Sequence, residues 1–237
     1  MKRHFPRLHR HIAARFAPDH VFGAHLTIGI FLILIGAWIF AEIAGDVVAR
    51  ARITQLDQHL ADWFHQHAKS GWTPWMIFVT HWHSQVGIVL MAIVLGLHFY
   101  RRMAHYWLAG LVLAVPGGLL LNVLLKYTFQ RPRPHFDDPL LTLSTFSFPS
   151  GHASGAVLFY GMLAAYLVCL TRSWSMRALI VLGALAMVAL VAFTRVYLGM
   201  HFLSDVLAAM AVSSAWLSIC ITAMSTLRRR RAIGTTE

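Results

Sequence analysis

The stretch from Thr194 to Asp205 carries three side chains whose types and spacing suit phosphate chemistry. His201 and Asp205 are four residues apart, a spacing that stacks two side chains on one face of a helix. A carboxylate that accepts from one imidazole nitrogen fixes the tautomer and leaves the other nitrogen free to attack. Arg195 adds a permanent cation whose planar fork fits phosphate oxygens. The stretch predicts an oriented nucleophile beside a phosphate clamp, although an ordinary polar helix end fits the same residues.

The composition places this stretch in a membrane protein. Of the 237 residues, 58% are hydrophobic and 12% are charged, whereas a soluble domain has about 25% charged residues. The net charge of +11 could indicate a nucleic-acid partner. However, the basic residues share no continuous face and the chain is too apolar, so we expect no nucleic-acid binding. Cys169 and Cys220 both lie in apolar runs and give neither a disulfide framework nor a metal-type spacing.

Six apolar runs are long enough to cross a bilayer, so we predict an all-α, polytopic membrane protein with six transmembrane helices. An amphipathic pattern between the first two runs predicts a short interfacial helix. An apolar lead-in at 72–82 precedes the second run, and a proline-rich loop follows the third. The expected spans are 23–44, 84–100, 106–125, 153–170, 177–193 and 202–224.

We divide the chain into a basic lead-in at 1–22, a six-span domain at 23–227 and a basic tail at 228–237. The lead-in is rich in Arg and poor in acids, as transit peptides are, but we interpret it as a cytoplasmic segment before the first span. Most of the 20 Lys and Arg residues lie at the termini and in the turns at 101–105 and 171–177. The excess of positive charge in cytoplasmic loops therefore predicts that both termini are cytoplasmic.

This orientation brings polar residues from four spans to the outer membrane face. Charged residues at this depth are costly unless they pair or serve a site. A group of cations with two histidines and one carboxylate suits a doubly charged anion, and phosphate is the obvious candidate. The residues are Lys126, Arg131, Arg133, Ser150, Gly151, His152, Arg195, His201 and Asp205.

Three blocks of this group resemble the signature of the type 2 phosphatidic acid phosphatase superfamily, the lipid phosphate phosphatases. The resemblance covers about residues 106–224 and points to the bacterial membrane-bound branch of undecaprenyl-diphosphatase-like and phosphatidylglycerophosphatase B-like enzymes. The third block begins with a threonine, Thr194, where the family usually has serine, so the hydroxyl is kept. The blocks are Lys126-x6-Arg133-Pro134, Pro149-Ser150-Gly151-His152 and Arg195-x5-His201-x3-Asp205.

The resemblance and the chemistry of the side chains imply the same roles. We expect His201 to attack phosphorus and form a phosphohistidine, with Asp205 orienting it. His152 is expected to be the general acid that protonates the leaving oxygen and then the base that activates water. We expect no metal and no cofactor, because side chains supply the positive charge. The expected phosphate-binding groups are Lys126, Arg133, Arg195, Ser150 and Gly151.

The expected function is metal-independent hydrolysis of a lipid phosphate or diphosphate in the inner (plasma) membrane, with the active site facing the periplasm or outside. Undecaprenyl diphosphate, phosphatidylglycerophosphate and phosphatidate all present a phosphate at the interface, and the sequence does not choose among them. A lipid-to-lipid phosphotransferase, for example onto lipid A, is the alternative. A transporter fits less well because the charges lie at one face and no inverted repeat is visible. The oligomeric state is left open.

Two H-x-H pairs lie outside these blocks. They are His65 with His67 and His81 with His83. A lone pair of this kind is a weak metal signal, so we interpret these residues as interfacial polar groups.

Overall fold

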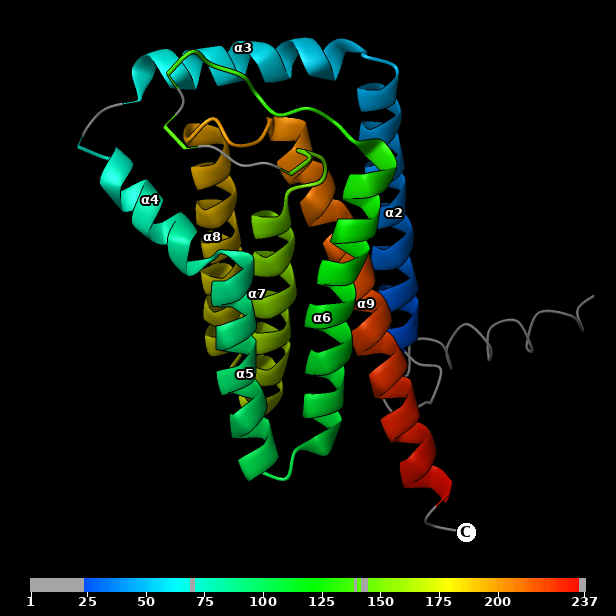
Figure 1. The fold of residues 1–237 in the computed structure, drawn as a ribbon. Coiled ribbons are helices and arrows are strands. Elements are labelled where there is room, and N and C mark those ends of the chain that lie inside the picture. The colour runs from blue at the N-terminus through cyan, green and yellow to red at the C-terminus, as the bar shows by residue number, and fades with distance from the viewer. Residues whose placement is uncertain (1–23, 69–70, 139, 142–144, 235–237) are drawn as a thin grey trace, which may run out of the picture.

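The computed structural model describes residues 24–68, 71–138, 140–141 and 145–234, so the lead-in predicted at 1–22 lies outside the described residues. Within these ranges the chain forms eight helices and no strand. They are α2 (Ala24–Val48), α3 (Arg52–His67), α4 (Thr73–Trp82), α5 (Gln85–Arg101), α6 (His105–Phe129), α7 (Gly151–Leu170), α8 (Trp174–Tyr197) and α9 (Leu203–Gly234), labelled as in Figure 1.

Five of the described helices are long and apolar enough to cross a membrane, and the bent pair α4–α5 makes six if it is counted as one span. The two halves of the pair meet at 52°. Ser84 ends the break by capping α5, where its hydroxyl accepts from the N–H of Gly87 at 3.2 Å. The predicted all-α membrane architecture is confirmed, and the apolar lead-in at 72–82 forms α4, the first helix of this bent pair.

Four helices end several residues beyond the predicted spans. The helix α2 extends past Ala44, α6 extends through Lys126, α8 extends to Tyr197, and α9 extends through the arginines at 228–231 that were predicted to form a separate tail. The apolar pattern ends where side chains become polar, but the backbone hydrogen bonds of a helix continue past that point. Lys126 therefore lies on the last turn of α6 rather than in the following loop.

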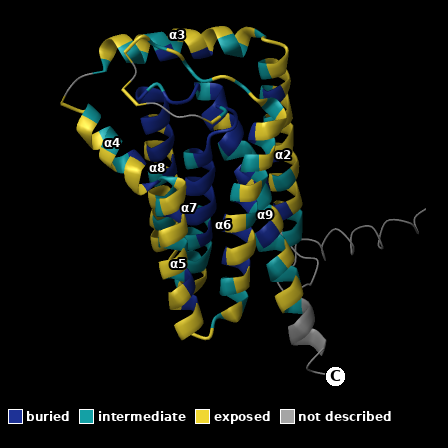
Figure 2. Ribbon diagram, viewed as in Figure 1, coloured by how far each residue is buried: buried dark blue, intermediate teal, exposed yellow. Residues whose placement is uncertain are grey.

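The helix α7 lies at the centre of the bundle and packs against α5, α6, α8 and α9. The helix α2 packs along α9, and α3 lies across one end of the bundle (Figure 1). Buried residues gather at this end, on the neighbouring turns of α7, α8 and α9 (Figure 2). We call it the α3 end.

The predicted interfacial helix is α3, but its inner face is only partly the apolar one that the pattern indicated, since Phe64 packs against the core beside polar residues. Leu56 and Trp63 are 50% and 52% exposed, whereas Asp57 and Ala61 are buried. The sequence therefore predicted the helix correctly and missed that its inner face carries a carboxylate.

The loop between α6 and α7 is fixed to the bundle by an aromatic anchor. Phe148 is fully buried, and its ring lies 5.9 Å from that of Phe40 on α2 and 5.0 Å from that of Phe129 on α6. The backbone N–H of Ser147 donates to the carbonyl of Arg131 at 2.8 Å. The last part of the loop is thereby held against the start of α7.

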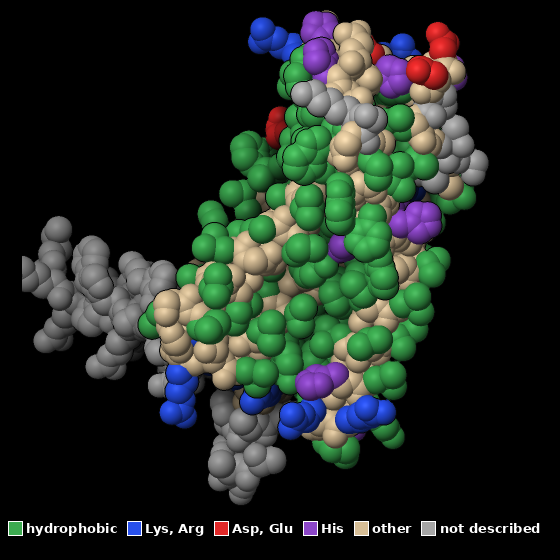
Figure 3. All heavy atoms as spheres, turned by 90° about the vertical axis from the view of Figure 1, so that its left-hand side faces the viewer, with side chains coloured by type: hydrophobic (Ala, Val, Ile, Leu, Met, Phe, Trp, Pro, Cys, Tyr) green, Lys and Arg blue, Asp and Glu red, His purple; other side chains and the backbone are tan. Residues whose placement is uncertain are grey.

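The surface matches a membrane environment. A broad hydrophobic band covers the middle of the face in Figure 3, with a cluster of Lys and Arg at the lower end and a mixture of His, acidic and basic residues at the α3 end. Large apolar side chains are exposed along the spans, for example Phe31 and Trp38, both at 62%. Exposure of this kind is stable where lipid covers it.

Candidate active site

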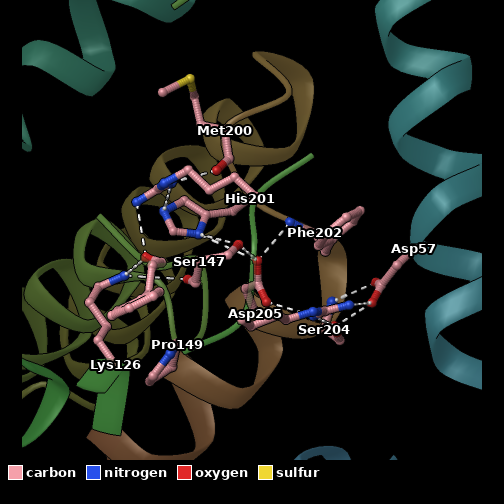
Figure 4. A network of polar contacts seen from close by, with 12 residues as sticks. Asp57, Lys126, Ser147, Pro149, Met200, His201, Phe202, Ser204 and Asp205 are labelled. Carbon is pink, nitrogen blue, oxygen red and sulfur yellow. Dashed lines mark hydrogen bonds and ion pairs between the residues drawn. The ribbon is translucent and has the colours of Figure 1, made fainter. Parts of the chain in front are cut away.

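Three of the predicted site residues, Lys126, His201 and Asp205, lie close together at the α3 end of the bundle (Figure 4). A cavity of about 430 Å³ lies there, between the α6–α7 loop and the first turn of α7. Five of the predicted site residues line it, namely Lys126, Arg133, Gly151, His152 and His201. The other three are buried, namely Ser150, Arg195 and Asp205.

His201 and Asp205 are close together, but not by stacking on a helix. His201 lies in the turn between α8 and α9, and Asp205 lies in the first turn of α9. Nδ1 of His201 is 3.5 Å from Oδ2 of Asp205. Gly199, with a φ of +65°, makes the turn, and Oδ2 of Asp205 accepts from the N–H of Phe202 at 2.9 Å. A capped turn, rather than a helix face, brings the pair together.

The imidazole of His201 is kept neutral by its surroundings. Its side chain is 2% exposed, and burial, followed by the charges of Arg133, Arg195 and Lys126, holds the pKa of His201 well below 6.5. The carboxylate of Asp205 beside Nδ1 favours the tautomer with the proton on that nitrogen. Nε2 then carries the lone pair, and Nη1 of Arg133 lies 3.1 Å from it.

Two cations of the site are bound to the same short strap, residues 145–147. Arg133 donates to the carbonyls of Thr145 and Phe146 at 2.6 and 3.1 Å. Nζ of Lys126 donates to that same Phe146 carbonyl at 2.6 Å. Burial lowers the pKa of Arg133, and the nearby charge of Asp205 opposes this shift. The strap therefore fixes both cations at the wall of the cavity.

Arg195 is a third buried cation, at the end of α8. Its Nη1 donates to the hydroxyl of Thr80 on α4, and its Nε is buried with no hydrogen-bond partner within the described residues. A buried donor without a partner is costly, so this nitrogen is available to an anionic oxygen. The neighbouring Thr194 donates its hydroxyl to the carbonyl of Val191 at 2.7 Å, inside its own helix.

The start of α7 forms another part of the site. The backbone N–H of Ser150 donates to the carbonyl of Asp205 at 3.0 Å, while its hydroxyl is buried without a partner in the described part of the chain. A Cβ at Gly151 would lie 3.1 Å from the Gln85 amide nitrogen, so a larger residue there would require the Gln85 side chain to shift. His152 lines the cavity and forms no hydrogen bond to another described residue. The free N–H groups of a helix start favour an anion.

A second layer of buried polar residues lies behind the cavity, and of its members the sequence indicated Arg131 alone. Ser147 donates its hydroxyl to Oδ2 of Asp205 and lies 3.5 Å from Nδ1 of His201. Arg131, which lies inside the first block, donates to Oδ1 of Asp205 at 2.6 Å. Thr80 and Asp57 complete this layer from α4 and α3. No sequence signal marked Ser147, Thr80 or Asp57, because each belongs to a segment far from the block that it supports.

The two H-x-H pairs have separate partners rather than a shared site. Within the described residues, no three His, Cys, Asp or Glu side chains are grouped as metal ligands. In the first pair, His65 lies 2.9 Å from Asp138 and His67 lies 2.8 Å from the Trp63 carbonyl. In the second pair, His83 lies 2.8 Å from the Tyr160 hydroxyl, and His81 is exposed.

Comparison with known proteins places the chain in a family. The sequence matches the PAP2 superfamily over residues 105–229. Phosphatidylglycerophosphatase B of Bacillus subtilis (strain 168) is 38% identical over 145 residues, which are 56% of this chain and 68% of that protein. The fold is similar to the crystal structure of a transmembrane PAP2-type phosphatidylglycerolphosphate phosphatase from Bacillus subtilis. That match has a TM-score of 0.69 and 27% identity over 81% of this chain and 94% of the other.

The matched region includes all eight predicted site residues and begins after α3 and α4. The family expected from the three sequence blocks is confirmed. The chain belongs to the PAP2 superfamily and is a phosphoric ester hydrolase that acts on membrane lipids.

Proposed function

We propose that this protein removes phosphate from a lipid phosphate or lipid diphosphate by transferring the phosphoryl group to His201. The observation that carries the proposal is the environment of this imidazole. Its Nδ1 lies 3.5 Å from Oδ2 of Asp205, and its Nε2 lies 3.1 Å from a guanidinium that lines the same cavity. A neutral, oriented imidazole beside a cationic pocket suits nucleophilic attack on phosphorus.

In the first step, Nε2 of His201 forms a bond to phosphorus while the bond from phosphorus to the leaving oxygen breaks. His152 donates a proton to that oxygen, and Asp205 stabilises the positive charge that develops on the His201 ring. In the second step, His152 takes a proton from water as the water oxygen attacks phosphorus. The P–N bond breaks, and free phosphate and neutral His201 result.

The cations of the site supply the electrostatic stabilisation. Lys126, Arg133, Arg195 and Arg131 oppose the carboxylates of Asp205 and Asp57, and four positive charges less two negative charges leave an excess of two. That excess matches a phosphate dianion. The equatorial oxygens of the phosphate would bind Lys126, Arg133 and Arg195. The start of α7, at Ser150 and Gly151, would donate further hydrogen bonds to the same phosphate. The reaction then needs no metal ion.

Phosphatidylglycerophosphate is the substrate that we place first, because both relatives are named for its hydrolysis. Undecaprenyl diphosphate and phosphatidate offer the same phosphate on an apolar tail. We place the site at the outer face of the inner membrane, with both termini in the cytoplasm, because the ends of α5 and α8 opposite the α3 end carry basic residues in and beside their turns, namely Arg101, Arg102, Arg172 and Arg177.

The test is phosphate release by the purified full-length protein in detergent with EDTA present, across these three lipids. We expect release from at least one lipid and none with His201→Ala. Transfer of the phosphoryl group to an added lipid acceptor, with no free phosphate formed, would identify a phosphotransferase instead. Lipid or phosphate flux without any hydrolysis, surviving His201→Ala, would overturn the proposal.

A further inference from the structure

Asp57 is a fully buried carboxylate in α3, outside the region that matches the family. It accepts hydrogen bonds from Nη2 of Arg131 at 2.8 Å and from the backbone N–H of Ser204 at 2.9 Å. The hydroxyl of Ser204 also donates to it. A buried charge is tolerated only when it is paired and hydrogen-bonded in this way. The helix across the end of the bundle is therefore bonded to the loop and helix that carry the site.

Arg131 joins Asp57 to Asp205 through separate nitrogens of one guanidinium. Its Nη2 pairs with Asp57, while its Nη1 donates to Oδ1 of Asp205 at 2.6 Å and to the Ser204 hydroxyl at 2.7 Å (Figure 4). The guanidinium lies 4.4 Å from the ring centroid of Phe202, which limits its rotation. The side chain is 10% exposed, so water competes little for these bonds.

The two oxygens of Asp205 are thereby divided between two functions. Oδ1 pairs with Arg131, and Oδ2 accepts from Ser147 and from the N–H of Phe202 and lies 3.5 Å from Nδ1 of His201. A guanidinium with only one carboxylate partner prefers a bidentate fork. Without the charge of Asp57, Arg131 would turn toward both oxygens of Asp205 and draw Oδ2 away from His201.

We infer that Asp57 is a positioning residue for the nucleophile: it holds Arg131 to one oxygen of Asp205 and so leaves the other oxygen to orient His201. The inference rests on the proposed function, because it needs His201 to be the group that attacks. On this inference, α3 contributes a residue that positions the nucleophile and does more than pack over the end of the bundle.

A purely structural role for Asp57 gives a different expectation. If it only fixed α3 to the bundle, its loss would lower the melting temperature and leave kcat per folded molecule unchanged. If it shaped the phosphate pocket, its loss would raise KM and weaken vanadate binding. The positioning role predicts a lower kcat with KM and vanadate affinity close to wild type.

The experiment compares full-length wild type with Asp57→Asn, Arg131→Lys and the double variant, measuring kcat, KM, vanadate inhibition and melting temperature in detergent. Asp62→Asn is the matched control on the same helix, since within the described residues the Asp62 carboxylate accepts a hydrogen bond from Gln58 at 3.3 Å and has no bond to the site. We expect kcat to fall about tenfold or more in each single variant and no further in the double variant, because both act through one contact. Asp62→Asn should match wild type.

A wild-type kcat in Asp57→Asn, or a loss that appears in KM and vanadate affinity instead, would overturn the inference. If Asp57→Asn does not fold, the kcat of Arg131→Lys tests the inference instead, because an ammonium cannot pair with Asp57 and Asp205 through two separate nitrogens as the guanidinium does. A wild-type kcat in that variant would equally overturn it. Failure of the proposed function is distinguishable, since it would show as wild-type activity that survives His201→Ala.

Discussion

Nη1 of Arg133 lies 3.1 Å from Nε2 of His201 and 2.6 Å from the carbonyl oxygen of Met200. One nitrogen of the guanidinium therefore contacts both the imidazole and the turn that carries it. A phosphate oxygen bound to Arg133 would lie beside the nitrogen that we expect to attack. The contact couples phosphate binding to the position of the nucleophile.

Replacing Arg133 with lysine should lower kcat/KM by about 100-fold, the effect of losing one preorganised donor at a developing charge. The ammonium has a single nitrogen and cannot bond Thr145, Phe146 and Met200 together as the guanidinium does. Steady-state phosphate release measures this. The matched control is Arg102→Lys at the opposite end, which should leave kcat/KM unchanged. Equal kcat/KM for Arg133→Lys and wild type would show that Arg133 does not bind the phosphate.

Changing Thr80 to valine should weaken substrate and vanadate binding by about tenfold, as loss of a hydrogen bond to a charged group does. Valine keeps the volume and removes the hydroxyl that accepts from Arg195. Thr80→Ser keeps the hydroxyl and should stay near wild type. The measurement is the vanadate inhibition constant of wild type, Thr80→Val and Thr80→Ser. Identical constants would show that Thr80 does not position Arg195.

Removing the imidazole of His152 should slow hydrolysis by about 10²- to 10⁴-fold for substrates with poor leaving groups. The loss should be much smaller for an aryl phosphate, whose leaving oxygen needs no proton. The ratio of kcat/KM for alkyl and aryl phosphates in His152→Ala and wild type measures this difference. An equal loss for both substrates would argue against the acid role.

The depressed pKa of His201 predicts a pH-dependent stability. The folded state keeps this imidazole neutral, whereas the unfolded chain protonates it below about pH 6.5. The unfolded state then binds more protons, so the folded state loses up to about 1.4 kcal/mol per pH unit as the pH falls below 6.5. Melting temperatures of wild type and His201→Gln should therefore converge or cross as the pH is lowered from 7.5 to 5. A difference that does not change with pH would contradict a neutral, buried His201.

Much of the fold was predictable because membrane spans have a strong local signal. Apolar runs of the right length predicted five of the spans, and the polar residues between them predicted which helix ends meet. The bend between α4 and α5 was less visible, since the polar break at His83 and Ser84 is only two residues long. The helix ends past Ala44 and Lys126 were missed because backbone bonding continues after the apolar pattern stops.

Five of the residues that line the cavity were predictable because they belong to local sequence blocks, but most of the layer behind them was not. Ser204 and Asp57 are 147 residues apart, and Arg195 and Thr80 are 115 apart. An aspartate in an amphipathic surface helix is expected to face water, and only the folded chain shows that Asp57 faces Arg131 instead. Even the proximity of His201 and Asp205 was predicted from a helix spacing, whereas a capped turn produces it.

The most direct test of the central claim is to trap the phosphoenzyme. Full-length protein is mixed with a lipid substrate labelled in the phosphate, quenched in alkali within one turnover and analysed by peptide mass spectrometry. We expect an acid-labile, alkali-stable phosphate on His201 and none in His201→Ala, with EDTA present throughout. A phosphate on another residue, or turnover that persists in His201→Ala, would contradict it.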